Sequence, residues 1–367
     1  MKILVLTSRY TASRDIIGED FGRQTRIFEA LAKLSNEIDF FCADYNKFEK
    51  RDLKLHDINV FIRPFGLKHF LNFLKDLKIK LESKKYDALI ATSDPLWGLI
   101  GYIFARKHKI KFIYDLHDNY ETYTTYRIPF FKYFDRYAVK HCDIVTTVSY
   151  ALKEKISKIR KKNVFVIQNG VNLKLFRPLD RKLSRKKLKI PLDAKIIAYT
   201  GSIQKTLGVD ILINVFQRLR KEMPDAKLLL VGRLTTDNLN NKEIPDIKHK
   251  DIISFDAIQQ EDVVLAINSA DVVIIPSPSN EFTKYCFPYK CVEYMACNTP
   301  IVAAGLSDVK LMLKDYKDSL FTPDDENDLY RKIKIQLKKK KIDYRKKLKD
   351  YTWDKIALKL NKIMENF

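Results

Sequence analysis

The chain lacks long apolar runs, and its cysteines have no regular spacing. No stretch approaches the roughly 20 apolar residues that a membrane-spanning helix needs. The cysteines number five and do not follow the spacing of a disulfide framework, which is typical of proteins in a reducing compartment. Cys286, Cys291 and Cys297 lie close in sequence, but their spacing fits no common zinc site, so we expect buried thiols and no bound metal.

The first residues, "MKILVLTSRY", have too short an apolar run for a signal peptide and carry polar residues where a cleavage site should be. We therefore expect them to form a buried strand, and we expect a cytoplasmic protein.

Acidic residues are few compared with basic ones. Asp and Glu number 46 against 68 Lys and Arg, so the formal net charge is +22. An excess of this size indicates an anionic partner, such as nucleic acid, an anionic membrane face or a phosphorylated substrate; the alternative is a solvated, lysine-rich surface. The lysines are not interleaved with stacking aromatics, and no RRM, KH or zinc-finger pattern occurs, so we expect no nucleic-acid partner.

Short β-branched runs alternate along the chain with longer amphipathic segments, which is typical of βα units and a mostly parallel sheet. A first series runs from "KILVLTS" to "NVFVIQN", and a second begins near Ala194 with "KIIAYTGS". The pattern predicts an α/β fold of two doubly wound units, residues 1–178 and 194–350, joined by a charged linker at 179–193. The tail, residues 351–367, reads as an amphipathic helix that must pack on a surface already built.

The segment Leu67–Lys85 is amphipathic, with Phe70, Leu74 and Leu77 opposite a lysine-rich face. A basic amphipathic helix can lie on an anionic membrane. It can equally be the crossover helix that a pair of parallel strands requires, and we favour this second interpretation, although one helix could do both.

The stretch "FPYKCVEYMACNTPIVAAG", residues 287–305, predicts a helix that begins at Pro288, then a turn and a small apolar strand. In open α/β sheets, ligands bind at the carboxyl ends of strands, where helix N-termini present free amides. Lys290 in the first turn adds positive charge for a phosphate, and Glu293 could accept hydrogen bonds from neutral sugar hydroxyls. Phosphate and sugar diol together predict a nucleotide site; the alternative is a surface Lys–Glu pair.

The stretch "KCVEYMACNTPIVAAG" resembles the donor-site motif of the GT-B glycosyltransferases, in particular glycosyltransferase family 4 (glycosyl transferases group 1). Other stretches resemble segments of the same family, in the same order along the chain. They are "GEDFGRQTRIFEALAKL", "KFIYDLHDNYE", "DIVTTVSYALKEKI" with "VFVIQNGVNLKLFRP", "TGSIQKTLGVDILINVF" and "ISFDAIQQEDVVLAINSADVVIIPS".

The resemblance implies two Rossmann-like domains that face each other across a cleft, with the last helix crossing back to the first domain. It implies a retaining, metal-independent glycosyltransferase of the hexosyltransferase type, without a cofactor. The donor would be a nucleotide sugar such as a UDP-, GDP- or ADP-sugar. The acceptor would be a glycan, a lipid-linked sugar or a polysaccharide, reached by peripheral contact with the inner membrane face.

The resemblance also implies roles for individual residues. Glu293 matches the glutamate that binds the donor ribose, while Lys290 and the amides after Pro288 would hold the diphosphate. Gly22 matches a glycine loop near the donor phosphate and acceptor, and His117 matches a histidine beside the donor sugar.

The sequence departs from the family near the diphosphate. The family usually has Arg after the glycine at Gly201 and Lys before the glycine at Gly208, where this chain has Ser202 and Leu207. We expect Lys205 and Lys290 to supply the charge instead; the alternative is a degenerate subunit that binds donor without catalysis.

A second departure concerns the family's paired glutamates. The first of them falls on Tyr285 here, and Glu281 lies further upstream on a longer loop, so both are candidate donor-binding residues.

Overall fold

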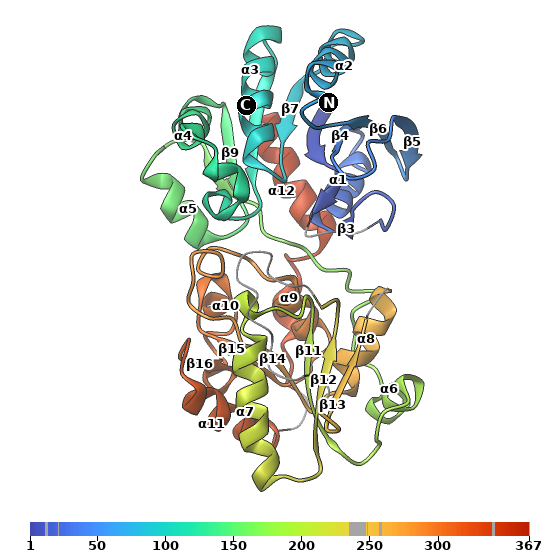
Figure 1. The fold of residues 1–367 in the computed structure, drawn as a ribbon, viewed down its shortest axis with the longest axis vertical. Helices are drawn as coiled ribbons and strands as arrows, with labels where there is room; N and C mark the ends of the chain where they lie inside the picture. The colour runs from blue at the N-terminus through green and yellow to red at the C-terminus, as the bar shows by residue number, and fades with distance from the viewer. Residues whose placement is uncertain are drawn as a thin grey trace. The chain divides into compact units, whose positions relative to one another are not determined.

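The computed structural model describes residues 1–11, 14–20, 22–234, 247, 249–256, 259–339 and 342–366. The chain divides into two compact units, with Met1–Gly170 and Trp353–Phe367 in unit 1 and Val171–Thr352 in unit 2 (Figure 1). The segments predicted as strands all form strands in the two sheets, which confirms the α/β class.

Unit 1 is built on an eight-stranded sheet in the order β10-β9-β8-β7-β1-β4-β6-β5. Neighbouring strands run parallel except β5, which pairs antiparallel with β6 at the edge. The strands are β1 (Lys2–Ser8), β4 (Glu37–Asp44), β5 (Arg51–Leu55), β6 (Ile58–Pro64), β7 (Ala88–Ala91), β8 (Lys111–Leu116), β9 (Ile144–Thr147) and β10 (Val164–Val166), with a separate pair β2 (Tyr10–Thr11) and β3 (Arg14–Asp15). The sequence pattern does not predict β5, because the charged and mostly exposed segment "RDLKL" gives no apolar periodicity.

Helices cover both faces of this sheet. They are α1 (Arg23–Ala32), α2 (Phe70–Glu82), α3 (Pro95–His108), α4 (Phe131–His141), α5 (Tyr150–Ser157) and α12 (Trp353–Glu365). Successive side chains of a strand point to opposite faces, and on β4 Phe40 packs against Phe28 of α1 while Phe41 packs against Phe73 of α2. Therefore α1 and α2 lie on opposite faces.

The helix α2 connects parallel strands β6 and β7, as the crossover interpretation predicted. Its buried side chains are Phe73, Leu77 and Leu81, so the packed stripe differs from the predicted one: Phe70 is exposed and Leu74 half-buried.

The C-terminal helix α12 returns to unit 1 and packs on α1 (Figure 1). Ile356, Ala357, Leu360 and Met364 join the core cluster that contains the inward side chains of α1 and β1. The apolar side of α12 therefore packs on unit 1, as expected for an amphipathic tail that needs an existing surface to cover it.

Unit 2 has a six-stranded parallel sheet in the order β13-β12-β11-β14-β15-β16. The strands are β11 (Lys195–Thr200), β12 (Ala226–Val231), β13 (Ile252–Phe255), β14 (Val272–Ile275), β15 (Ile301–Ala304) and β16 (Leu320–Phe321). The helices are α6 (Arg181–Leu188), α7 (Val209–Glu222), α8 (Gln260–Ser269), α9 (Tyr289–Ala296), α10 (Ser307–Met312) and α11 (Glu326–Gln336). One core cluster lies under α7 and α11.

The linker predicted at 179–193 is wrong for most of its length. Residues Arg181–Leu188 form α6, which packs on α8 inside unit 2, and unit 2 begins at Val171 rather than after residue 178. Arg185 causes the difference, because its buried guanidinium forms an ion pair with Asp271 at 2.8 Å and ties the helix to the sheet. The sequence of the charged segment alone does not reveal that Arg185 pairs with Asp271, because the two residues are 86 positions apart.

Candidate functional site

The sheet of unit 2 places two loops beside each other at its topological switch point. From β11 the chain adds strands β12 and β13 on one side, and strands β14, β15 and β16 lie on the other side, so the switch point is between β11 and β14. Open α/β sheets bind ligands at such a point, outside the carboxyl ends of the strands. The loop after β11 begins at Gly201, and the loop after β14 leads into α9. Asn280 of the second loop donates a side-chain hydrogen bond to the Thr206 carbonyl of the first at 3.0 Å, which fixes the two loops together.

The helix α9 begins after Pro288, which occupies the N-cap position in an extended conformation. Proline has no N–H to donate, and the first amides of the helix point out of its N-terminus toward the loops. Lys290 and Glu293 follow in the first turns, as predicted, and both side chains are half-buried.

Lys290 is held over the ring of Tyr199, a residue of β11. Its Nζ donates a hydrogen bond to the Tyr199 hydroxyl at 2.9 Å and lies 4.0 Å from the ring centroid, a cation–π contact. The hydroxyl in turn donates to the Ser202 carbonyl at 2.7 Å. Burial lowers the pKa of Lys290 to about 8, so the ammonium remains protonated at neutral pH.

Gly201 makes room for this ammonium. Its φ is +118°, a region that side chains rarely adopt, and a Cβ placed there would lie 3.1 Å from Nζ of Lys290. The predicted site residues Gly201, Ser202 and Lys290 are thus brought together by the structure.

Burial raises the pKa of Glu293 to about 7, and the charge of Lys290 opposes that rise. A carboxyl group with a pKa near neutrality changes between acceptor and donor close to physiological pH. Its neighbour Tyr294 is buried and accepts hydrogen bonds from the amide of Thr200 at 2.9 Å and from its hydroxyl at 3.1 Å. These bonds anchor α9 to the end of β11 and fix where Glu293 lies.

The other predicted donor-site residues lie on the two loops. Lys205 is half-exposed and its Nζ lies 3.9 Å from the carboxylate of Asp210. Glu281 is exposed and lies 3.7 Å from Lys284, and Tyr285 is half-buried. None of these has a described contact with Lys290 or Glu293.

His117 belongs to unit 1, where it follows β8 and is buried. The Tyr120 hydroxyl donates to the carbonyl of Asp115 at 3.0 Å and lies 2.8 Å from Nδ1 of His117. The Tyr120 hydroxyl therefore fixes the orientation of the His117 ring through its Nδ1 edge and leaves Nε2 on the opposite edge. Burial lowers the pKa of His117 to about 4, so the ring is neutral at pH 7.

Nε2 of His117 lies buried, 3.5 Å from the carboxylate of Asp118, and makes no hydrogen bond to the described residues. A buried ring nitrogen without a hydrogen-bond partner is costly, so this atom is suited to form a hydrogen bond with a ligand hydroxyl, which can donate or accept.

An ion pair holds the His117 strand to the glycine loop. Arg23 begins α1 directly after Gly22 and forms a buried ion pair at 3.0 Å with Asp115, two positions before His117. Gly22 itself has φ +98° at the N-cap of α1, which suits glycine. The structure therefore brings the Gly22 loop and the His117 strand of unit 1 together.

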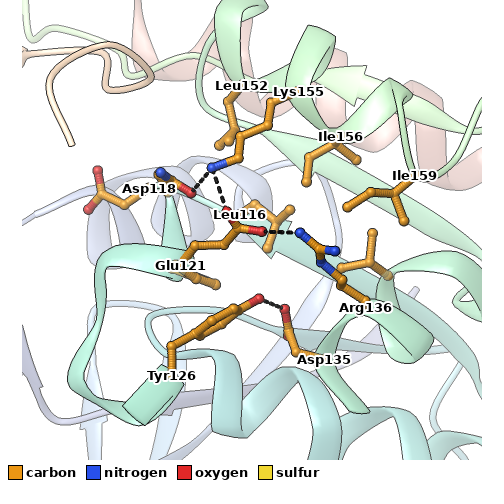
Figure 2. A pocket seen from close by; sticks show the side chains of 13 residues that line it. Leu116, Asp118, Glu121, Tyr126, Asp135, Arg136, Leu152, Lys155, Ile156 and Ile159 are labelled. Carbon is orange, nitrogen blue, oxygen red and sulfur yellow. Dashed lines mark hydrogen bonds and ion pairs between the residues drawn. The ribbon is translucent and has the colours of Figure 1, made fainter. Parts of the chain in front are cut away.

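A pocket is lined by the segment that follows His117 and by side chains of α4 and α5 (Figure 2). Glu121 forms ion pairs there with Lys155 at 2.8 Å and with Arg136 at 3.1 Å. Asp135 accepts hydrogen bonds from the hydroxyls of Tyr126 and Tyr114. Glu121, Arg136 and Lys155 are thus already paired, and Asp135 is held by tyrosine hydroxyls, so we do not assign this pocket to a substrate.

The sequence pattern did not reveal Tyr199, Arg23 or Tyr120. Tyr199 and Arg23 act through partners that only the tertiary structure brings close, since Lys290 lies 91 residues from Tyr199 and Asp115 lies 92 residues from Arg23. Tyr120 is only three residues from His117, but its hydroxyl contact with that ring depends on how the loop folds. Among the described residues, no cluster of His, Cys, Asp and Glu is arranged to hold a metal ion. Nor does the described part of the chain include a helix whose length and apolar character would let it cross a membrane.

Two sequence profiles match the chain. The profile described as "Glycosyltransferase Family 4" matches residues 25–175, and that described as "Glycosyl transferases group 1" matches residues 180–355. Among curated proteins, the chain is similar to the D-inositol 3-phosphate glycosyltransferase of Mycobacterium bovis, at 28% identity over 159 residues. That match covers 41% of this chain and 31% of the relative, so the chain spans about a third of the length of the curated relatives it matches.

Solved structures resemble the whole chain. Sucrose-phosphate synthase of Thermosynechococcus elongatus has a TM-score of 0.81 at 18% identity, covering 100% of this chain and 98% of that one. HepE of Anabaena, solved in complex with UDP, has a TM-score of 0.77 at 16% identity, with 100% of both chains covered. With its two parallel α/β units and both profile matches, the chain belongs to the GT-B glycosyltransferases related to family 4.

Proposed function

We propose that this protein transfers a hexose from a nucleoside-diphosphate sugar to a hydroxyl acceptor, with retention of configuration and without a required metal ion. The observation that carries the proposal is the position of Lys290 and Glu293 in the first turns of α9, at the switch point of the unit 2 sheet. A cation beside free helix amides suits a diphosphate, and a neighbouring carboxylate suits a ribose diol.

The chemistry requires stabilisation of a departing nucleoside diphosphate. Lys290 supplies a positive charge held in place by Tyr199, so little reorganisation is needed as negative charge develops on the leaving group. Glu293 would bind the ribose, with Gly201, Ser202, Lys205, Tyr285, Glu281 and Pro288 as further donor-site candidates. In unit 1, Nε2 of His117 would form a hydrogen bond with a hydroxyl of the transferred sugar, and the amides near Gly22 would approach the phosphate and acceptor.

We propose a UDP-sugar as the first donor to test. This choice is supported by the ligands of structural neighbours, since HepE of Anabaena was solved with UDP and with UDP-glucose. GDP- and ADP-sugars are the alternatives. For the acceptor we propose a glycan or lipid-linked sugar in polysaccharide biosynthesis, reached from the cytoplasmic face of a membrane that the protein contacts peripherally.

The donor site is tested by thermal shift with UDP-, GDP- and ADP-sugars. A ligand that binds only the folded state raises the melting temperature, so we expect one of these sugars to stabilise the protein. Glu293→Ala should abolish most of the shift, whereas exposed Glu261→Ala on α8 should retain it as a matched control. Equal shifts in both variants, or no shift with any donor, would contradict the site.

A second candidate function is a subunit that binds nucleotide sugar without transferring it. Ser202 and Leu207 favour this alternative, because they replace the cationic pair that the family usually places on the diphosphate. Donor hydrolysis without acceptor decides between the two. We expect slow hydrolysis that Lys290→Ala reduces on the order of 10²-fold; donor binding with no hydrolysis in the unaltered protein would favour the subunit.

A further inference from the structure

The helix α4 and the loop before it expose a stripe of large apolar side chains. The exposed fractions are 72% for Phe130, 72% for Tyr133, 54% for Phe134, 54% for Tyr137 and 52% for Ile128. Residues three and four apart share one side of a helix, so the aromatic members of this set lie along a single stripe. We name Ile128, Phe130, Tyr133, Phe134 and Tyr137 the α4 surface.

Phe130 is held in an unfavourable backbone conformation. Its φ is +62°, in the left-handed region that bulky residues rarely adopt. The residue is also largely exposed, so packing in the core does not explain why an aromatic side chain stands there. Strain of this kind at an exposed position indicates a role outside folding.

The exposed charged side chains of α4 and of the end of α3 are cations, and the nearby half-buried Asp143 is paired with Arg106 of α3. Exposed cations surround the stripe, while its one acid, Asp135, is buried and accepts hydrogen bonds from Tyr114 and Tyr126. Glu121, in the pocket beside α4, forms ion pairs with Arg136 and Lys155 (Figure 2). The exposed cations are Arg127, Lys132, Arg136 and Lys140, with Lys107 and Lys109 at the end of the adjoining helix α3.

We propose that the α4 surface docks on an anionic lipid bilayer. Aromatic rings favour the interface between headgroups and acyl chains, where lysine and arginine side chains reach the lipid phosphates. The inference rests on the proposed function only in expecting a membrane near the acceptor, and it depends on no residue of the donor site.

The charge pattern also argues against a second copy of the chain as the occupant. A symmetric dimer would place the same patch against itself, so the cations of one α4 surface would face those of the other. An anionic bilayer satisfies both the apolar stripe and the cations.

The α2 segment is another apolar surface of unit 1. It exposes Leu67, Leu71 and Ile79, but its most exposed aromatic side chain, Phe70, is only 38% exposed. Helix α2 also carries Asp76 and Glu82 among its lysines, which weakens attraction to anionic lipid. Substitutions on α4 and on α2 can therefore distinguish which of the two surfaces binds the membrane.

The test is co-sedimentation with phosphatidylcholine vesicles, with and without phosphatidylglycerol, at low and high salt. The α4 variant is Phe130→Asn with Phe134→Ser, because asparagine tolerates positive φ and should preserve or raise the melting temperature. Leu71→Ser serves as the α2 variant, and Leu183→Ser on α6, exposed to 52%, is the matched control in unit 2. Light scattering reports the oligomeric state, and the donor-induced thermal shift reports the donor site.

We expect the unaltered protein to sediment with anionic vesicles at low salt and the α4 variant to bind at least about tenfold more weakly. The α2 variant and the α6 control should bind like the unaltered protein. Equal vesicle binding by the α4 variant, loss of binding in the α2 variant alone, or a dimer that the α4 variant dissociates would each overturn the proposal. An unchanged donor-induced shift in any of these cases would leave the proposed transferase intact.

Discussion

At the residue scale, burial moves the pKa values of Lys290 and Glu293 toward each other. The lysine falls to about 8 and the carboxyl rises to about 7. Below pH 7 the glutamate is protonated, and above pH 8 the lysine is neutral. The charged forms of both groups, which a diphosphate and a ribose diol require, therefore coexist mainly between these two values.

Donor affinity should consequently be highest between pH 7 and pH 8. As pH rises through the lysine pKa, the diphosphate loses its cation; as pH falls through the glutamate pKa, the ribose loses its acceptor. Below and above this range, donor affinity should fall by up to about tenfold per pH unit. Titration calorimetry with the donor identified by thermal shift measures this profile.

Two conservative variants provide the controls. Lys290→Arg should remove the alkaline limb, since arginine stays charged throughout, and Glu293→Gln should remove the acidic limb. A flat profile in the unaltered protein would contradict the roles assigned to both groups.

Local pattern sufficed to find Lys290 and Glu293, because proline, cation and carboxylate stand within one short helix. It did not reveal Tyr199, whose hydroxyl and ring position the lysine from another strand. A tyrosine in a buried strand is expected to be a core residue from sequence alone. Only the packing of α9 beside β11 shows that its hydroxyl contacts Lys290.

At the element scale, α6 demonstrates how a buried ion pair turns a charged segment into part of a domain. Arg185 donates to the Ser269 carbonyl at 2.9 Å and to the Ala194 carbonyl at 3.0 Å as well as pairing with Asp271. A segment held by so many buried bonds is a structural element of unit 2 rather than a linker.

Arg185→Ala should destabilise unit 2 by about 1 to 3 kcal/mol, because Asp271 keeps Arg181 and the Ile196 amide as partners but loses its buried guanidinium partner. Lys187 is an exposed residue of the same helix, and Lys187→Ala should change the free energy of unfolding by less than about 0.5 kcal/mol. Urea unfolding of both variants measures the difference. Similar midpoints would mean that α6 contributes little to the fold of unit 2.

At the scale of the whole molecule, the chain leaves unit 1 after Gly170 and returns to it at Trp353. The last helix therefore stabilises the unit that begins the chain. Leu360 is buried in the same core cluster as Phe28 of α1.

Leu360→Ala should cost unit 1 about 2 to 5 kcal/mol through the cavity it creates. Hydrogen exchange should show faster exchange in β1 and α1, with β11 and α7 unchanged. Exposed Lys355→Ala on the same helix is the control. Faster exchange confined to unit 2 would contradict the assignment of α12 to unit 1.

The sequence by itself determined the alternation of strands and helices, the two-unit α/β architecture and the charged turn of α9, since each depends on neighbouring residues. Tertiary structure alone decided that Tyr199 holds Lys290, that Arg185 anchors α6, and that the aromatic side chains of α4 face outward. The physical reason is that burial and pairing depend on which elements pack together, and their partners lie too far along the chain for local periodicity to identify.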